Sequence, residues 1–262
     1  KDIYWYGIII AAGFLLAAAF CSWRAKDFGI KKDDFLDMLL WGLPIGIICA
    51  RIYYVIFYLS LYRDGQGKFQ WSEAIAIWDG GLAIYGGVIG GILTCLVVCK
   101  HKKLPFLAMA DLSVMGLFIG QIMGRWGNFV NQEAYGGACD LPWRMGLIVD
   151  GQLITVHPTF LYESLWNLMG LCLLFFVVRR VRRFDGELFL CYLGWYGLGR
   201  FWIEGLRTDS LYLFGTGIRV SQLVALVSVL VAAALLVRMR VFVKPDPQKM
   251  WVHRATENNQ AK

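Results

Sequence analysis

The chain has 262 residues, of which 58% are hydrophobic, 15% aromatic and only 17% charged. Soluble domains carry about 25% charged residues, and long apolar runs recur along this chain, so the composition excludes an ordinary soluble protein and predicts a polytopic membrane protein. The net charge of +7 does not predict a nucleic-acid partner, because the basic residues cluster between apolar runs. No linker or internal repeat divides the chain, which predicts a single integral-membrane domain over 1–262 with a polar tail from about residue 244.

The apolar runs predict an all-α fold with seven transmembrane helices. A proline at position 44 interrupts the second, and paired glycines in the third predict close helix packing. Asp111, at the start of the fourth, is expected to be a helix cap or a partner of the helix dipole. The predicted spans are Ile3–Trp23, Phe35–Leu59, Gly81–Cys99, Phe106–Met123, His157–Val178, Glu187–Leu206 and Ile218–Val237.

The connections between spans alternate in basic charge. Those after spans one, three, five and seven hold 4, 3, 4 and 6 lysines and arginines, whereas the N-terminus and each of the others hold no more than 2. Basic connections stay in the cytoplasm. The pattern therefore predicts an outside N-terminus, a cytoplasmic C-terminus and an extracytoplasmic loop region, 124–156, between the fourth and fifth helices.

The start of that loop region concentrates polar side chains directly after an apolar span. The segment Gly-Arg-Trp-Gly-Asn-Phe-Val-Asn-Gln-Glu-Ala-Tyr-Gly at 124–136 supplies Arg125, Asn128, Asn131 and Glu133 within ten residues. Such groups are costly at the end of a membrane helix unless they bind something. Arg125 and Asn128 would share a face if the helix continues through them.

A second polar set lies in the sixth predicted span. Tyr196, Arg200, Glu204 and Arg207 follow i, i+4, i+8 and i+11 spacing, so a helix places them on one face. One interpretation is an internal ion network that only joins helices. The other is a site for an anion: guanidinium and amide donors suit a phosphate, and the common phosphate-bearing molecule of a bilayer is a phospholipid.

Metal and disulfide chemistry find no support in the sequence. Seven cysteines are present, six of them in apolar runs, and no Cys/His or carboxylate cluster has metal-ligand spacing, so we expect no metal and no cofactor.

The 124–136 segment resembles the motif of bacterial prolipoprotein diacylglyceryl transferases. The resemblance extends in order over nearly the whole chain and includes these further segments: Trp5-Tyr6-Gly7, Arg51-Ile52-Tyr53-Tyr54, 78–87, Ala110-Asp111, His157-Pro158-Thr159-Phe160-Leu161-Tyr162-Glu163 and 196–207.

The resemblance implies an enzyme of the bacterial plasma (inner) membrane, with its active site toward the extracytoplasmic side. It would transfer the diacylglyceryl group of phosphatidylglycerol to the lipobox cysteine of a preprolipoprotein, beside its signal peptide, as the first step of lipoprotein maturation. The products would be a thioether-linked precursor and glycerol 1-phosphate.

The same resemblance implies roles for individual residues. Arg125 would bind the headgroup and Arg200 would stabilise the leaving phosphate, where negative charge develops. Asn128, Asn131 and Glu133 would orient the headgroup or the arginine, and Glu204 and Arg207 would extend the binding site. Tyr6 and Tyr196 would line the cavity.

The proton acceptor for the attacking thiol is left open. Many family members have a histidine where this chain has Tyr85, and a neutral phenol, with a pKa near ~10, is a poor base. Tyr85 as a phenolate or hydrogen-bond donor, His157 as a substitute base, and activation of the thiol by the arginines are the alternatives. We favour the last, with Tyr85 positioning the phosphate.

Two other functions compete with this hypothesis. An anion transporter or channel with an arginine-lined pathway would also need buried arginines, although the chain lacks the repeat symmetry of many transporters. A lipid-headgroup phosphotransferase would normally need acidic metal ligands, which the spacing does not supply.

Overall fold

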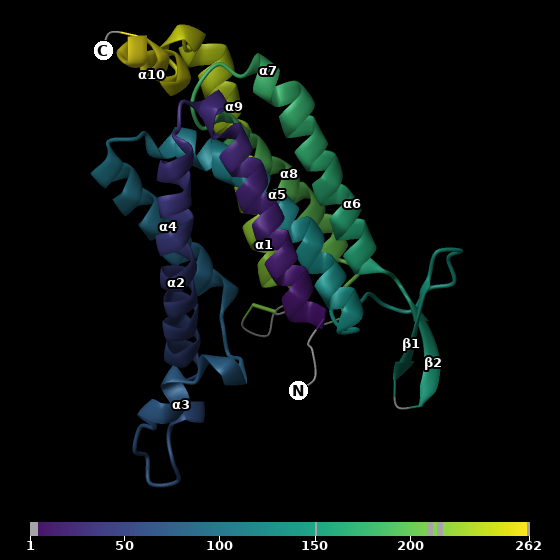
Figure 1. Cartoon of the computed structure of the whole chain (residues 1–262). Helices are drawn as coiled ribbons and strands as arrows, with labels where there is room; N and C mark the ends of the chain where they lie inside the picture. The colour runs from purple at the N-terminus through teal and green to yellow at the C-terminus, as the bar shows by residue number, and fades with distance from the viewer. Residues whose placement is uncertain (1–4, 150, 209–211, 214–216, 261–262) are drawn as a thin grey trace. The chain divides into compact units, whose positions relative to one another are not determined.

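The protein is mostly helical. The structure, a computed structural model, describes residues 5–149, 151–208, 212–213 and 217–260 (Figure 1). The predicted start of the first span at Ile3 and the last two residues of the tail lie outside the described residues. The helices are α1 Trp5–Arg24, α2 Lys32–Phe57, α3 Trp71–Ile75, α4 Ile84–Lys102, α5 Phe106–Val130, α6 Thr159–Cys172, α7 Arg179–Val181, α8 Glu187–Glu204, α9 Val220–Val237 and α10 Trp251–Gln260.

Six helical segments are long and apolar enough to cross a bilayer, which makes the chain a multi-pass membrane protein. They are Trp5–Phe28, Lys32–Phe57, Ile84–Lys102, Phe106–Val130, Thr159–Val181 and Val220–Val243. The sixth predicted span does form a helix, α8, but it carries Glu187, Arg200 and Glu204 and is therefore less apolar than the other six. Pro44 does not interrupt its helix, because α2 continues through it.

The expectation of an all-α fold is wrong in one segment. Strands β1, Met145–Val149, and β2, Gln152–Val156, form an antiparallel hairpin within the region expected to be a loop. The expected loop also begins later than Gly124, since α5 continues to Val130.

The chain forms two compact units, residues 1–29 with 110–262 and residues 30–109. In the second unit α2 packs on α4 through the paired glycines: a Cβ at Gly86 would lie 2.4 Å from Cys49 O. The predicted close packing of these glycines is confirmed. Arg51, buried in α2, donates hydrogen bonds to the carbonyls of Glu73, Ala74, Gly80 and Gly81 and so fastens the segment between α3 and α4.

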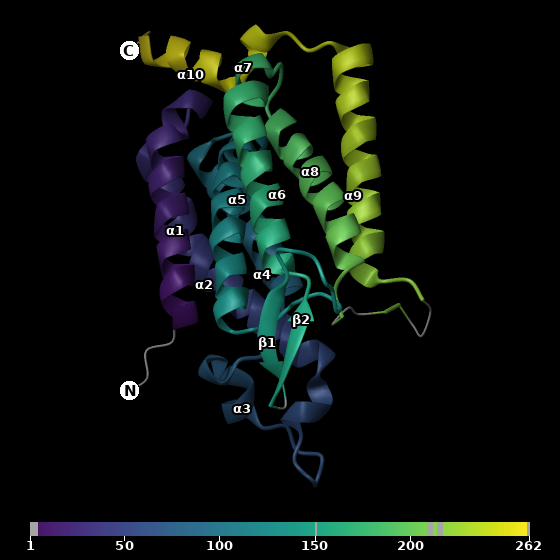
Figure 2. The same cartoon turned by 90° about the vertical axis from the view of Figure 1, so that its right-hand side faces the viewer.

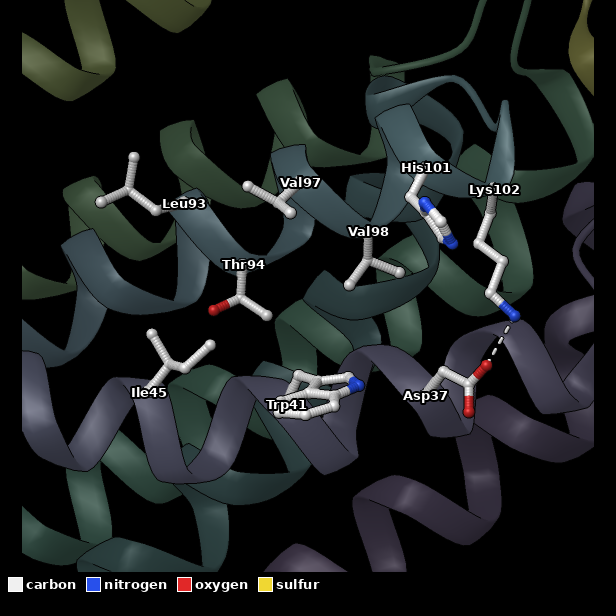
Figure 3. A pocket seen from close by; sticks show the side chains of 9 residues that line it. All are labelled: Asp37, Trp41, Ile45, Leu93, Thr94, Val97, Val98, His101 and Lys102. Carbon is white, nitrogen blue, oxygen red and sulfur yellow. Dashed lines mark hydrogen bonds and ion pairs between the residues drawn. The ribbon is translucent and has the colours of Figure 1, made fainter.

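Between α2 and α4 the same unit has an apolar groove of about 540 Å³. Figure 3 shows Trp41, Ile45 and Leu93 along it, with His101 and Lys102 at one end. Lys102 Nζ lies 2.6 Å from an oxygen of Asp37 and 3.2 Å from one of Asp34. The lysine at the groove's end is therefore already paired with carboxylates of its own unit.

In the first unit, α6 and α8 are joined by a reciprocal tryptophan contact. The Trp166 and Trp195 rings stack at 4.6 Å, and each indole N–H donates to the backbone carbonyl of the other residue, at 2.9 and 2.8 Å. Each ring fits against a glycine of the facing helix: a Cβ at Gly199 would lie 2.3 Å from Trp166, and one at Gly170 would lie 2.5 Å from Trp195. On its other side α8 runs beside α9 (Figure 2).

The first turn of α8 is fixed by a buried carboxylate. Asp111, fully buried in α5, accepts hydrogen bonds from the backbone N–H groups of Gly186 and Phe189, at 2.8 and 2.9 Å. The expectation that Asp111 is a cap is confirmed, although it caps α8 rather than its own helix. The capped end and the tryptophan contact together set the position of Arg200 along α8.

Candidate active site

A single buried carboxylate, Glu163 of α6, brings three arginines together. Its two oxygens lie 2.7 Å from an Arg125 nitrogen, 3.1 Å from an Arg200 nitrogen and 3.7 Å from an Arg207 nitrogen. These arginines come from the end of α5, from α8 and from the turn after α8. The two polar sets singled out from the sequence therefore form one cluster inside the first unit.

The predicted stripe on α8 is confirmed for its helical part. Arg200 Nη2 lies 2.6 Å from a Glu204 oxygen, one turn along the helix. Helix α8 ends at Glu204, so Arg207 lies on the turn that follows and not on the predicted helical face. It still reaches Glu163, because that turn carries its side chain back toward α6.

On the other side of the cluster, Arg125 is held by a chain of amides. Because α5 continues through the segment, Arg125 and Asn128 share a face, and an Arg125 nitrogen donates to Asn128 Oδ1 at 3.1 Å. Asn128 Nδ2 donates to Glu133 at 2.8 Å, and Asn131 Nδ2 lies 3.4 Å from the same oxygen. These four residues thus form a connected set in which Glu133 orients the amides and Asn128 orients the guanidinium.

Burial separates the charges of the cluster. The side chains of Glu163 and Glu204 are 5% and 2% exposed, whereas those of Arg125, Arg200 and Arg207 are 20%, 19% and 12% exposed. The carboxylates are therefore buried, whereas each arginine side chain keeps part of its surface accessible. An arriving anion would therefore meet donors that are already oriented.

The loop between α5 and β1 is fastened to the end of α8. Gly136 N–H donates to His157 O, and Gly137 N–H donates to Leu206 O at 2.9 Å. A Cβ at Gly136 would lie 2.7 Å from the His157 side chain, so only glycine fits where these two backbone segments meet. These contacts place the residues after Glu133 against the same turn that carries Arg207.

The two predicted lining tyrosines lie on different parts of the first unit. The Tyr6 ring packs on Gly127, where a Cβ would lie 2.8 Å from it, and this places Tyr6 on the backbone between Arg125 and Asn128. Tyr196 stacks on Tyr192 at 5.7 Å, one turn from Arg200 on α8. Both side chains therefore adjoin residues of the cluster.

The two candidate proton acceptors belong to different units of the chain. His157 Nδ1 lies 3.3 Å from the Tyr162 hydroxyl, just before α6. Tyr85 belongs to the second unit, in the first turn of α4, where it is 43% exposed and its ring centre lies 6.3 Å from that of Tyr53. Among the described residues no group of three or more His, Cys, Asp or Glu side chains is arranged to hold a metal ion.

Comparison with known proteins decides the family. The profile of prolipoprotein diacylglyceryl transferases matches residues 1–238. The chain is 43% identical to the phosphatidylglycerol--prolipoprotein diacylglyceryl transferase of Lysinibacillus sphaericus over 253 residues, which is 93% of this chain and 90% of that protein. The chain belongs to the prolipoprotein diacylglyceryl transferase family.

Other members are equally similar. The enzymes of the same name from Limosilactobacillus reuteri and Clostridioides difficile are 47% and 45% identical, over 91% and 87% of this chain and 87% and 88% of theirs. The similarity extends over nearly the full length of each protein, so the membership applies to the whole membrane chain and not to a shared fragment.

Within this family member, the sequence interpretation missed the residue at the centre of the cluster. Glu163 lies within the first two turns of the predicted span His157–Val178, and an ionisable residue in a membrane span is by itself a reason to expect a site. The hairpin was also missed, although an Asp-Gly pair between two apolar runs, at 150–151, is a strong hairpin pattern.

Proposed function

We propose that the protein transfers the diacylglyceryl group of phosphatidylglycerol to the lipobox cysteine of preprolipoproteins. The cysteine sulfur forms a bond to the terminal glycerol carbon of the diacylglyceryl group, and the bond from that carbon to the phosphate oxygen breaks. Glycerol 1-phosphate leaves with the electron pair. The observation that supports this is the cluster of partly exposed arginines on buried Glu163, in a chain of this family.

The leaving phosphate gains negative charge as its bond to carbon breaks. Arg200 is proposed to meet that charge, while Arg125 binds the headgroup and Arg207 adds a third cation on the same side. Glu163 and Glu204 hold these guanidiniums in place before the lipid arrives. Asn128, Asn131 and Glu133 are proposed to orient Arg125 and the headgroup, with Tyr6 and Tyr196 lining the cavity.

The thiol must lose its proton before or during attack, because the thiolate is the nucleophile. We propose that the positive potential of the arginines favours the thiolate, and that Tyr85 positions the phosphate through its hydroxyl. His157 is assigned a structural role, since it hydrogen-bonds at the start of α6.

The proposed topology has seven spans in the bacterial plasma membrane, with α8 as the polar span in the interior of the bundle. A membrane helix with Arg200 and Glu204 on one face is expected to direct that face toward protein. The N-terminus would be outside, the C-terminus cytoplasmic, and the arginine cluster on the extracytoplasmic side. Residues 1–262 would act as one transferase domain.

The decisive experiment combines the purified protein with vesicles of phosphatidylglycerol and a lipobox peptide, and then weighs the peptide by mass spectrometry. We expect a mass gain of one diacylglyceryl group in the unaltered protein and none in Arg125→Ala or Arg200→Ala, which should still insert and fold. A peptide of unchanged mass, with anion flux through the protein in liposomes, would instead indicate a transporter. Near-normal turnover in Arg200→Ala would contradict the leaving-group role.

A further inference from the structure

The hairpin beside the arginine cluster has a free strand edge. We infer that the outer edge of β1 binds the stretch of substrate polypeptide that follows the acceptor cysteine, as an added β-strand. This inference rests on the proposed function, because the substrate polypeptide is the preprolipoprotein.

The edge of β1 lacks the features that normally block strand pairing. Its five residues, Met-Gly-Leu-Ile-Val, contain no charge and no proline, whereas exposed edges in soluble domains are usually protected by such residues. β2 is bordered on both sides, by β1 and by the chain around Ala138. Among the described residues no strand borders the outer edge of β1.

The register shows which backbone groups point out from this edge. Cys139 N–H donates to Thr155 O, so the polar groups of Thr155 point away from β1, and Thr155 is the partner of Gly146. In an antiparallel pair of this kind both residues direct their N–H and C=O outward, and the pattern recurs every second residue. Gly146 and Ile148 therefore offer their N–H and C=O groups to an incoming strand.

The side chains of the hairpin suit the same partner. Leu147 and Val156 are buried, whereas Ile148 and its cross-strand partner Leu153 are 71% and 73% exposed on the opposite face. An added strand would extend this face and cover part of Ile148, which lies on the strand next to it. Backbone pairing with pockets for alternate side chains is how exposed sheet edges bind extended peptides.

The start of β1 lies next to the arginine cluster. Trp143, two residues before the strand, donates its indole N–H to the Tyr162 hydroxyl at 2.8 Å, and Tyr162 adjoins Glu163. From there the hairpin projects beyond the end of α6 (Figure 2). A polypeptide whose cysteine reacts at the cluster would leave along β1 and run in the same direction as it. A polypeptide strand pairs both the N–H and the C=O groups of such an edge at their regular spacing.

The test compares two acceptor peptides with the full-length protein in phosphatidylglycerol vesicles. Both contain the signal peptide and lipobox; one ends just after the cysteine and the other continues for eight residues. Ile148→Pro removes one outward N–H and leaves the β1–β2 hydrogen bonds, which involve the neighbouring residues, in place. We expect kcat/KM for the long peptide to fall about threefold to tenfold, through KM, with the short peptide unaffected. Ile148→Val is the matched control and should match the unaltered protein with both peptides.

Three results would overturn the inference. The first is an equal loss of kcat/KM with both peptides in Ile148→Pro, which would indicate damage to the hairpin itself. The second is no loss of kcat/KM with either peptide in that variant. The third is a Leu153→Lys variant that slows both peptides in vesicles and neither in detergent, which would indicate contact with the membrane surface.

A crosslinking experiment does not depend on turnover. A photoreactive phenylalanine analogue in place of Ile148 should crosslink the long peptide and not the short one, and crosslinks to lipid alone would contradict the inference. If the unaltered protein lipidates neither peptide, the proposed function fails, and the crosslink still reports whether the edge binds polypeptide.

Discussion

Glu163 is the residue on which the proposed site depends most. It is a nearly buried carboxylate shared by guanidiniums from three segments of chain. Removing one partner of a buried ion pair leaves the others without compensation, and this costs far more than the pair's net contribution to stability. We therefore propose that Glu163 positions Arg125 and Arg200.

For Glu163→Gln, we expect diacylglyceryl transfer to fall at least tenfold and the free energy of unfolding to drop by about 3 kcal/mol, because three arginines lose their shared counter-ion. Transfer is measured by peptide mass and stability by thermal unfolding in detergent. Glu73→Gln is the control, since that side chain is exposed in the second unit and its loss should change stability by less than about 0.5 kcal/mol. A Glu163→Gln variant with normal stability and transfer would show that the arginines hold their positions without it.

The role proposed for Tyr85 can be tested by a substitution that removes only its hydroxyl group. Tyr85→Phe should lower the transfer rate about tenfold through the loss of one hydrogen bond to the charged phosphate, while the pH dependence of the rate stays the same. Tyr85→His should recover part of the rate, because an imidazole also donates a hydrogen bond. If the Phe variant shifts the pH profile, the hydroxyl is the proton acceptor; if it is fully active, the hydroxyl has no role.

At the level of single residues the sequence indicated the arginines of the cluster better than Glu163, the carboxylate that they share. The spacing of Arg125 and Asn128 and of Arg200 and Glu204 predicts contacts along one helix, and both contacts are present. Its partners are 37 to 44 positions away in the sequence, so no local spacing reveals the contacts of Glu163. These partners are Arg125, Arg200 and Arg207. Its charge within an apolar run and its place in the 157–163 segment of the family resemblance were the two indications of it.

At the level of elements, helix registers decide whether these side chains meet. The tryptophan contact between α6 and α8 lies three residues from Glu163 and five from Arg200. Its glycines admit no side chain, because the indole that fills each space is itself hydrogen-bonded. We therefore expect a small change at this contact to shift the arginine cluster.

Gly199→Ala should therefore destabilise the protein by about 1–3 kcal/mol and reduce transfer, since its Cβ would lie 2.3 Å from Trp166 and Arg200 is the next residue. Thermal unfolding and peptide mass report the two effects. Gly120→Ala is the matched control: it lies on α5 in the same unit, and a Cβ there meets open space, so the change should be neutral or slightly stabilising. Equal behaviour of the two variants would contradict the role of the tryptophan contact.

The sequence predicted helix positions well and helix ends less well. Apolar runs locate the spans, but α5 continues through its polar end and α8 stops before Arg207. Both deviations occur where polar residues follow an apolar run, because side-chain partners elsewhere in the fold decide whether the helix continues there. Those partners are not visible in hydropathy.

At the level of the whole molecule, the division into two compact units could not be predicted from the sequence. Lipid-facing and protein-facing surfaces of membrane helices are both apolar, so hydropathy does not separate them. The glycine pairs of α4 predicted that this helix packs closely, and it does so on α2, but the pattern does not name the partner.

The proposed orientation of the chain can be tested through Cys139. It is the cysteine outside the helices, on the chain that borders β2. A membrane-impermeant maleimide should label it in intact spheroplasts, because the segment is proposed to be extracytoplasmic. Cys139→Ser should lose the label. Labelling that requires permeabilised cells would reverse the topology and place the arginine cluster on the cytoplasmic side.

The tryptophan contact has a local twofold symmetry. Helix α6 carries Trp166 and Gly170, α8 carries Trp195 and Gly199, and each tryptophan fits the other helix's glycine, so the two antiparallel helices use the same four-residue step. Sliding either helix by one turn would leave both indoles facing a side chain instead of a glycine. The tryptophan contact therefore admits a single register of α6 against α8. A Trp-x-x-x-Gly pattern that occurs on two helices of one membrane protein would predict an antiparallel pair from sequence alone.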